Sequence, residues 1–473
     1  MPGLIQSLET GKRGLTANQT ALTTVEHNIA NVNTPGYTRQ ETVLEATPPF
    51  HTTIGDLGTG VRAADVRRMK DLYLDTQIQD QQANLGKMQA RQPYLMQIEA
   101  AFNEANTPGL GQAMSDFFAA FRSLAENPHG IGERKVLREK ATQLTNAFKR
   151  VNLALHQVEF DAQAEAAATI TKINAYAEEI ARLNGAIAGK GGRANDLKDQ
   201  RDVLLGKLSE LVEIEVLEQG QDFKVFVGGK AIVDGVRARE LGYRANPRGG
   251  DFQIFFVDGS YNEDITNRIQ GGRLAGLKCV LLEDVPQYLG QLDHLAYTFG
   301  HEVNSLHREG YGLDGQTGIP LFVLEKSNPA SEQDASRFLA LSEVVQRSDG
   351  AIAAAQTRDG LPGDNRNALA LAGLWNNYVI ADPGSTNPKT FAEYLGGIGS
   401  DIGAKIDRGD TEQKTTQGLL GQLMTQRDAV SGVSLDEELV TLTRYQRAFQ
   451  ASSQSLIVTQ TLFDSLLSIV RGT

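Results

Sequence analysis

Hydrophobic residues recur every seven positions near the amino terminus of the chain. The stronger of two rows comprises Met1, Leu8, Leu15, Leu22 and Ile29, and the weaker row comprises Leu4, Gly11, Asn18, Val25 and Val32. A repeat of this length places an apolar stripe along one side of a helix. The sequence therefore predicts a helix of about 29 residues, roughly 44 Å long, at this end of the chain.

The carboxy-terminal stretch repeats more strictly. Its apolar row comprises Leu435, Leu442, Phe449, Leu456, Phe463 and Val470, and its half-polar companion row comprises Leu439, Gln446, Ser453, Gln460 and Leu467. Ser434, with Glu437 three positions later, is typical of a capping box that starts a helix. A helix with one apolar row buries too little surface to be stable alone. The two terminal helices are therefore predicted to pair as a coiled coil, in which polar positions limit stability and fix the register.

The middle of the chain changes its periodicity several times. Helical patterns cover residues 65–105, 110–126, 133–188, 196–211, 285–306, 365–378 and 389–431. Over residues 212–272 the period shifts toward two, and short apolar runs are separated by Gly-Gly, Asp-Gly and Asn-Pro turns. This pattern predicts a small antiparallel β module. Residues 320–360 are candidates for further strands of that module.

The order of these elements predicts a mainly α fold with inserted β structure. We expect a terminal coiled-coil assembly domain made of residues 1–33 and 433–473. A helical body domain is expected from residues 34–211, 273–319 and 361–432. The β-rich outer domain is then formed by residues 212–272 and 320–360. A length of 473 residues agrees with several domains rather than one core.

Composition excludes several classes of function. The net charge of −12 argues against a nucleic-acid partner, which needs a basic face. No segment resembles a cleaved signal peptide, and no run of about twenty apolar residues predicts membrane insertion. The single cysteine, Cys279, cannot form an intramolecular disulfide and is expected to be buried and unreactive.

No catalytic, cofactor or metal site is predicted. His301 and His307 superficially resemble a zinc-binding helix, but they lie six residues apart, so their side chains point about 120° away from each other. Solvated or capping histidines are the expected interpretation. The segment 314–318 has loop chemistry without the spacing of a calcium-binding loop. The chain also lacks the glycine-rich phosphate loops and the nucleophile elbow of common enzyme families.

One segment carries a recognisable signature. Residues 28–40, NIANVNTPGYTRQ, closely resemble the signature of the flagellar rod, hook and hook-associated proteins. Pro35 and Gly36 favour a type II turn that ends the first helix. By this resemblance, the residues that shape the exit from the helix are Asn28, Asn31, Asn33, Thr34, Pro35, Gly36 and Tyr37. Residues 435–470, with YQRAFQAS at 445–452, resemble the matching carboxy-terminal helix of that family.

Regions in the middle of the chain are similar to the hook-associated branch that joins hook to filament. They are residues 272–277, 292–296, 303–307, 310–322, 363–372 and 391–397. The chain looks short for that branch, which leaves the number of outer domains open. A hook or distal-rod protein is the alternative within the family, and a secreted coiled-coil effector or adhesin is the alternative outside it.

The resemblance implies a structural subunit rather than an enzyme, without a cofactor. Such a protein leaves the cell unfolded through flagellar type III export, without a cleaved signal peptide, and self-assembles into a ring outside the cell. Its implied partners are hook protein, the third hook-associated protein and a cytoplasmic export chaperone at the carboxy-terminal helix. The implied assembly interface comprises Leu4, Leu8, Leu15, Leu22, Ile29, Leu435, Leu439, Leu442, Phe449, Leu456, Phe463 and Val470.

Overall fold

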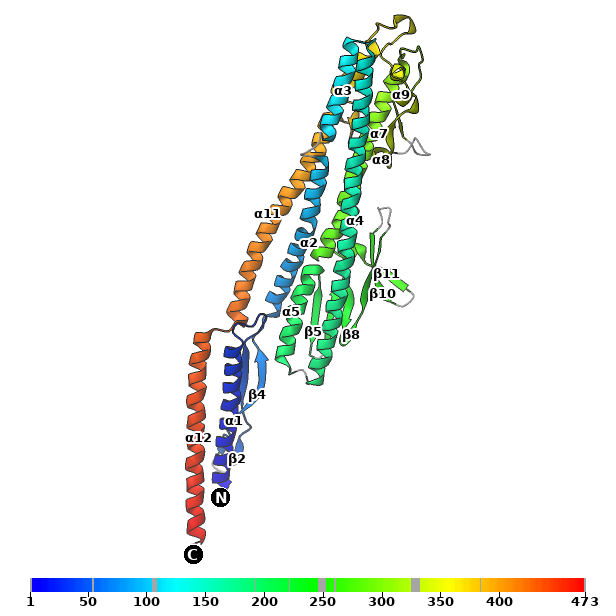
Figure 1. Cartoon of the computed structure of the whole chain (residues 1–473). Coiled ribbons are helices and arrows are strands. Elements are labelled where there is room, and N and C mark those ends of the chain that lie inside the picture. The colour runs from blue at the N-terminus through cyan, green and yellow to red at the C-terminus, as the bar shows by residue number, and fades with distance from the viewer. Residues whose placement is uncertain are drawn as a thin grey trace. The chain divides into compact units, whose positions relative to one another are not determined.

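The computed structural model describes residues 2–52, 55–103, 109–191, 193–220, 222–245, 252–258, 261–324, 332–382 and 384–471 (Figure 1). The chain divides into two compact units, and several long helices contribute residues to both. The first unit comprises residues 1–83, 173–240 and 416–473, and the second comprises residues 84–172 and 241–415.

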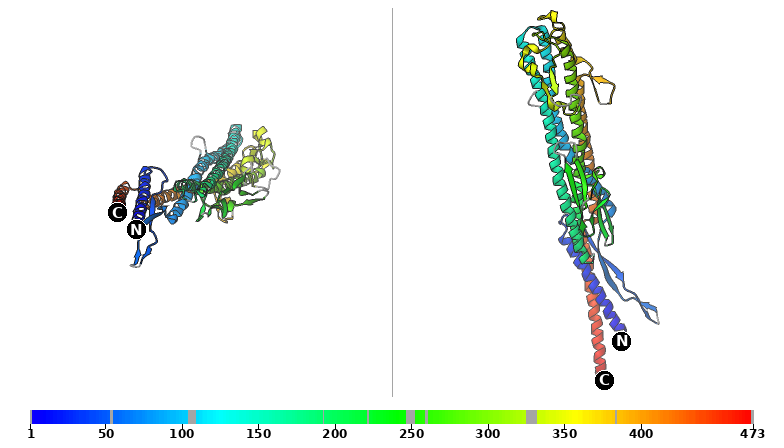
Figure 2. Two further views of the ribbon diagram at one scale, coloured as in Figure 1. Left: turned by 90° about the horizontal axis from the view of Figure 1, so that it is seen from below. Right: turned by 90° about the vertical axis from the view of Figure 1, so that its right-hand side faces the viewer.

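The first unit contains both termini. Its elements are α1 (Pro2–Ala30), β1 (Gln40–Ala46), β2 (Phe50–Thr52), β3 (Gly55–Leu57), β4 (Val61–Arg68), the start of α2 (Leu72–Phe102), the end of α4 (Ile131–Gly189), α5 (Asn195–Leu211), β5 (Glu215–Gln219), β6 (Asp222–Val227), β7 (Lys230–Asp234), β8 (Arg237–Ala238), the end of α11 (Phe391–Ser431) and α12 (Leu435–Arg471). Helices α1 and α12 lie side by side and run in opposite directions (Figures 1 and 2). The predicted pairing of the two terminal helices is therefore confirmed within this chain.

A β-hairpin packs along α1. Strands β1 and β4 are antiparallel, and Gln40 lies opposite Arg68. The Thr42 hydroxyl donates to the Thr24 hydroxyl over 2.9 Å, which links β1 to α1. The prediction of a helix from residue 65 was wrong for residues 65–68, which belong to β4. Pairing with β1 satisfies the backbone there and outweighs the local helical pattern.

A four-stranded antiparallel sheet, in the order β5-β6-β7-β8, completes the first unit. Alternate residues of β6, Phe223, Val225 and Val227, are buried, as expected for a sheet with one covered face. Asn184 of α4 donates to the Gly235 carbonyl oxygen over 2.8 Å and so fixes the turn between β7 and β8. This sheet falls within the β module predicted from the two-residue period.

The second unit is mainly helical. It contains α3 (Leu110–Glu126), α6 (Gly272–Cys279), a π-helical turn (Val280–Asp284), α7 (Val285–Glu309), α8 (Ala335–Phe338), α9 (Glu343–Arg347), α10 (Arg366–Gly373) and the remaining parts of α2, α4 and α11. Short 3-10 helices cover Thr266–Arg268, Asp349–Ala351, Arg358–Gly360 and Leu374–Asn376. Its core holds a cluster of aromatic rings in contact, formed by Phe117, Phe118, Phe299, Phe322 and Phe391.

Three small sheets accompany these helices. They are β9 (Glu240–Ala245) with β10 (Phe252–Asp258) and β11 (Tyr261–Asp264), β12 (Phe322–Leu324) with β13 (Leu339–Leu341), and β14 (Ile380–Ala381) with β15 (Pro388–Lys389). The predicted fold class, mainly α with inserted antiparallel β structure, is confirmed. In the described part of residues 320–360, β12 and β13 pair only with each other. The division into two compact units does not test the three predicted domains, and their boundaries remain a proposal.

His307 differs from the expectation of a solvated or capping histidine, because it is 1% exposed. Its Nδ1 donates to the Ile319 carbonyl oxygen over 2.8 Å, and its Nε2 accepts from the Ala353 amide over 3.0 Å. These two bonds require the neutral ring and connect α7 to two loops. His301 is exposed and stacks on Tyr297. Cys279 is buried as predicted, and burial raises the pKa of its thiol.

Acidification is expected to destabilise the second unit through His307. Burial lowers the pKa of His307 from 6.5 to about 4. Between these values the unfolded chain binds the proton more readily, so the free energy of unfolding falls as the pH falls through this window, by about 3 kcal/mol in total. Urea unfolding of wild type and His307→Gln at several pH values measures the effect. The wild type should show the steeper pH dependence, and equal slopes would contradict this role for His307. The exposed-site variant His301→Gln serves as the control and should retain the wild-type slope.

Candidate assembly site at the paired termini

The segment after α1 folds into the predicted type II turn. The Tyr37 amide donates to the Thr34 carbonyl oxygen over 3.1 Å, and Gly36 has a φ of +78°. A Cβ atom on Gly36 would lie only 2.2 Å from Cγ2 of Val203 on α5. Glycine is therefore required here twice, once by the backbone angle and once by the close approach of the turn to α5.

Asn28 connects the turn to both terminal helices. Its side chain is 1% exposed, and its Oδ1 accepts from the Tyr37 hydroxyl over 2.8 Å and from the Gln40 amide over 3.0 Å. Its Nδ2 donates to the Gln40 carbonyl oxygen over 2.9 Å and to Glu438 Oε2 over 3.1 Å. The amide thus uses both donors and both acceptor positions. One residue of α1 thereby fixes the turn, the start of β1 and the first turn of α12.

Glu438 forms the α12 side of this arrangement. Its buried carboxylate also accepts from Arg39 Nε over 2.7 Å, while Arg39 Nη1 lies 3.2 Å from Glu437. The Arg39 amide donates to the Ser431 carbonyl oxygen over 2.8 Å. Helix α12 begins at Leu435, as predicted. The carboxylate of Glu437, which the sequence assigns to a capping box with Ser434, pairs with Arg39. A buried carboxylate with these charged and polar partners holds the start of α12 against the turn.

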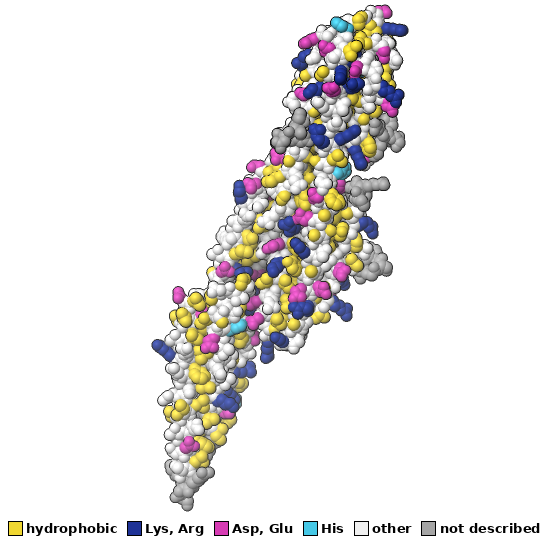
Figure 3. Space-filling view, in the orientation of Figure 1, with side chains coloured by type: hydrophobic (Ala, Val, Ile, Leu, Met, Phe, Trp, Pro, Cys, Tyr) yellow, Lys and Arg dark blue, Asp and Glu magenta, His cyan; other side chains and the backbone are white. Residues whose placement is uncertain are grey.

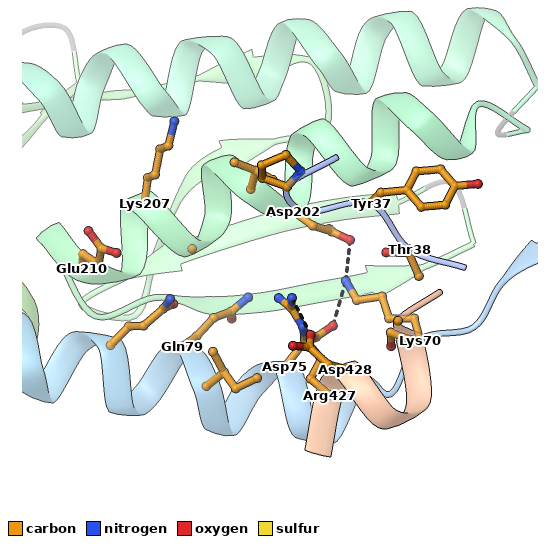
Figure 4. A pocket seen from close by; sticks show the side chains of 18 residues that line it. Tyr37, Thr38, Lys70, Asp75, Gln79, Asp202, Lys207, Glu210, Arg427 and Asp428 are labelled. Atoms are coloured by element: carbon orange, nitrogen blue, oxygen red, sulfur yellow. Dashed lines mark hydrogen bonds and ion pairs between the residues drawn. The ribbon is translucent and has the colours of Figure 1, made fainter. Parts of the chain in front are cut away.

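A buried ionic network anchors the same turn to α5. The Thr38 amide and Arg68 Nη1 both donate to Asp199, over 3.1 Å and 2.9 Å. Arg68 also donates to Asp202 over 2.7 Å, and Lys70 Nζ lies 2.7 Å from the same carboxylate. Figure 4 shows Lys70 between Asp202 and Asp75 at the edge of a cavity of 290 Å³. Burial alone would raise the pKa of Asp202, but Lys70 and Arg68 hold it below its ordinary value.

The remaining residues of the signature shape the end of α1. Asn31 Nδ2 donates to the His27 carbonyl oxygen over 3.0 Å, and the Thr34 hydroxyl donates to Asn31 Oδ1 over 3.1 Å. The Thr34 amide donates to the Asn31 carbonyl oxygen over 2.9 Å. Asn33 and Pro35 are exposed. Five residues of the signature therefore make contacts that shape the end of α1, namely Asn28, Asn31, Thr34, Gly36 and Tyr37.

Small residues allow α1 and α12 to approach closely. A Cβ atom on Gly11 would lie 2.9 Å from Leu456 Cγ, and one on Gly14 would lie 3.4 Å from Ser452 Oγ. Asn18 Nδ2 donates to Ser452 Oγ over 3.2 Å. The weaker amino-terminal row therefore lies against α12. Gln446 and Gln460 of the carboxy-terminal companion row are exposed, so they do not lie between the two helices. The polar contact between α1 and α12 is the bond from Asn18 to Ser452.

The predicted interface residues differ in exposure. Those that are partly buried are Leu4, Leu8, Leu15, Leu22, Ile29, Leu442, Phe449, Leu456 and Phe463. Leu435 and Leu439 are 46% and 51% exposed, so the described residues leave about half of each side chain uncovered. The side chain of Val470 lies outside the described side chains. Whether all these residues form an assembly interface remains a proposal.

Apart from Asn28, which belongs to the signature, sequence reasoning missed the buried row of α1. This row comprises Ala17, Ala21, Thr24 and Asn28. Its members are small or polar, so a search for large apolar residues does not detect it. Their spacing of four, three and four residues is nevertheless that of one helix face. Thr24 and Asn28 both bond to β1, which identifies this row as the face that the hairpin covers.

The described residues hold neither a metal-binding cluster nor a membrane-spanning helix. No group of three or more His, Cys, Asp or Glu residues there could hold a metal ion. No helix of the described part combines the length and hydropathy needed to cross a bilayer. Asp314 forms a local turn, in which its Oδ1 accepts from the Gln316 amide over 3.0 Å.

Family models match three parts of the chain. A model for the helical domain of flagellar hook-associated protein FlgK matches residues 95–322. A model for flagella basal body rod proteins matches residues 8–38, which include the turn. A model for the carboxy-terminal part of flagellar basal body rod FlgEFG proteins matches residues 425–469. The ends thus resemble rod proteins in general, and the middle distinguishes the hook-associated branch.

Known relatives agree with these matches over nearly the whole length. Flagellar hook-associated protein 1 of Bacillus subtilis is 26% identical, covering 99% of this chain and 99% of the relative. Those of Escherichia coli and Salmonella typhimurium are 27% and 28% identical, each covering 96% of this chain and 98% of the relative.

A solved structure shares the fold. It is described as the flagellar hook junction protein FlgK from Burkholderia pseudomallei, with a TM-score of 0.64 and 17% identity, covering 75% of this chain and 100% of that chain. The chain is thus a component of the bacterial flagellum. It belongs to the flagellar hook-associated protein 1 family.

Proposed function

We propose that this chain is a structural subunit at the junction between hook and filament, and that its paired termini are its assembly site. The observation that carries the proposal is the arrangement around Asn28. This residue ties the signature turn to both α1 and the start of α12. We propose no catalytic role for any residue of the chain.

Exposed apolar residues support assembly through α12. Seven large apolar residues of this helix are between 39% and 72% exposed, namely Leu435, Leu439, Val440, Ile457, Val458, Leu462 and Leu466. Figure 3 shows hydrophobic side chains on the surface of the terminal helices. These seven residues form two clusters, at residues 435–440 and 457–466, and exposed apolar clusters of this kind are typical of interaction sites. Neighbouring subunits in a ring would cover them.

The partners follow from the place of the family in the flagellum. Hook protein is the proposed neighbour on one side of the ring, and the third hook-associated protein is the neighbour on the other. Before export, a cytoplasmic chaperone would cover the apolar residues of α12. The chain would then leave the cell through flagellar type III export without a cleaved signal peptide and assemble outside it.

Complementation tests this function directly. The chain is expressed in a strain that lacks its hook–filament junction protein, and attached filaments are scored by electron microscopy and motility in soft agar. The expected result is that filaments remain attached to hooks. Export of the chain without filament attachment, with flagellin released into the medium, would contradict the proposal. An empty vector and the strain's own junction protein are the controls.

A further inference from the structure

One face of α12 is open along most of the helix. It comprises Val440, Arg444, Arg447, Ala451, Val458 and Leu462, which share one side at 100° per residue. The three large apolar members are 72%, 52% and 53% exposed. The partly buried residues that lie toward α1, including Phe449 and Leu456, are on the opposite side of the helix. We call this face the outer stripe of α12.

The outer stripe also carries positive charge. Arg444 and Arg447 are exposed and are the only basic residues of α12 before Arg471. The guanidinium of Arg444 lies 5.0 Å from the centroid of the Tyr445 ring and also borders a cavity against α1 and β1. Among the described residues it forms no ion pair with a carboxylate. A partner for this part of the stripe should therefore combine apolar and acidic groups.

The same unit contains a cleft with that combination. The cleft, of 420 Å³, lies between the signature turn and the helices α4 and α5. Apolar lining comes from Leu183, Val203 and Leu204, and acidic lining comes from Glu179, Asp196 and Asp199. We call it the acidic cleft. It is adjacent to the turn that fixes α1 and α12, so it is continuous with the proposed assembly site.

The two outer carboxylates of the acidic cleft are accessible. The side chains of Glu179 and Asp196 are 41% and 61% exposed. Glu179 pairs with Arg182 at the rim, and Asp196 accepts from His27 and Gln40. Burial raises the pKa of Tyr37 above its ordinary range, and the charges of Asp196 and Asp199 raise it further. The cleft therefore favours a cation.

We propose that the acidic cleft of one copy holds the segment 440–447 of α12 from a neighbouring copy. Val440 packs against the apolar wall, and Arg444 and Arg447 pair with Asp196 and Glu179. These three side chains lie on one side of the helix and span about 10 Å along it. The inference rests on the proposed function, because copies meet in this way only within the assembled ring.

The contact joins two different surfaces of the same chain. Such a head-to-tail contact repeats from copy to copy and generates a ring or a helical array rather than a closed dimer. It also gives the signature turn a role in assembly, since Pro35, Gly36 and Tyr37 form one wall of the cleft. The ionic part of the contact should weaken at high salt.

Cysteine cross-linking in assembled flagella tests the contact. Val203 lines the cleft and is 36% exposed, and the only native thiol, Cys279, is buried. Flagella that carry Val440→Cys with Val203→Cys should form a ladder of cross-linked copies on a non-reducing gel. Neither single variant should do so. The matched control, Val458→Cys with Val203→Cys, uses the same stripe about 27 Å further along the helix and should not cross-link.

Two results would overturn this inference. One is the absence of the cross-link in flagella whose filaments remain attached, which leaves the proposed function intact. The other is a cross-link to a different flagellar protein, which would make that protein the occupant. If the wild-type chain does not attach filaments at all, the proposed function fails and the inference fails with it.

Charge reversal provides an independent measurement. Arg444→Glu with Arg447→Glu should reduce the fraction of hooks with filaments at least tenfold. Adding Glu179→Lys and Asp196→Lys to the same chain should restore most of it. Because Asp196 also bonds His27 and Gln40, a second rescue with Glu179→Lys alone guards against misfolding. Failure of both rescues in folded, exported protein would contradict the pairing.

Discussion

Replacing both Leu442 and Leu456 with aspartate is expected to abolish motility while the remainder of the chain stays folded. Both side chains lie in the partly buried row of α12, and Leu456 contacts the position of Gly11. Placing two carboxylates in this partly buried row costs several kcal/mol, because each replaces an apolar side chain and loses part of its contact with water. Pairing of α1 and α12 should then be lost, and with it assembly. Swimming in soft agar and circular dichroism of the purified chain measure the two parts of this result.

A matched control separates the position of the charge from its mere presence. Gln446 and Gln460 lie on the same helix and are exposed. The variant with aspartate at both of these positions adds the same charge and should remain motile. Motile cells with aspartate at 442 and 456 would show that the helix pair is not essential. Loss of helical signal beyond that of the two terminal helices would show that the variant acts by general unfolding.

Replacing Gly36 with alanine is expected to lower the free energy of unfolding of the first unit by about 2–4 kcal/mol. Alanine at a φ of +78° costs about 1 kcal/mol of backbone strain. Its Cβ would also lie 2.2 Å from Val203 Cγ2, and relieving such an overlap typically costs 1–3 kcal/mol. Urea unfolding, followed by a probe in the first unit, measures the loss.

Gly229 offers a control for the strain alone. It has a φ of +76°, and a Cβ there would meet nothing within 4 Å. Gly229→Ala should therefore cost about 1 kcal/mol. Combining Gly36→Ala with Val203→Ala should recover part of the loss, because it removes the overlap but not the strain. Equal effects of the two glycine substitutions would mean that contact with α5 does not restrain the turn.

Local patterns predicted much of the fold. The helix at residues 110–126 and the start of α12 at Leu435 agree with the structure. The type II turn at Pro35 and Gly36 also agrees, because its geometry depends on two adjacent residue types. Each of these features is determined by neighbours in the sequence.

Features that depend on distant residues could not be predicted in the same way. The hydrogen bond between Asn28 and Glu438 joins residues 410 positions apart. The antiparallel direction of α1 and α12 likewise depends on contacts between the two ends of the chain. The strand at residues 65–68 forms because β1 supplies its hydrogen bonds. His307 is buried because two remote loops provide partners for both ring nitrogens. A single sequence contains no periodic signal for such contacts.

The pairing of the two termini in the assembled flagellum is the central claim, and a disulfide across the pair tests it most directly. A Cβ on Gly14 would lie 3.9 Å from Cβ of Ser452, a separation that suits a disulfide. Flagella that carry Gly14→Cys with Ser452→Cys are isolated, oxidised and analysed on a non-reducing gel. We expect an intrachain disulfide in nearly all copies and intact filaments. Free thiols or bonds only between copies in attached flagella would contradict it.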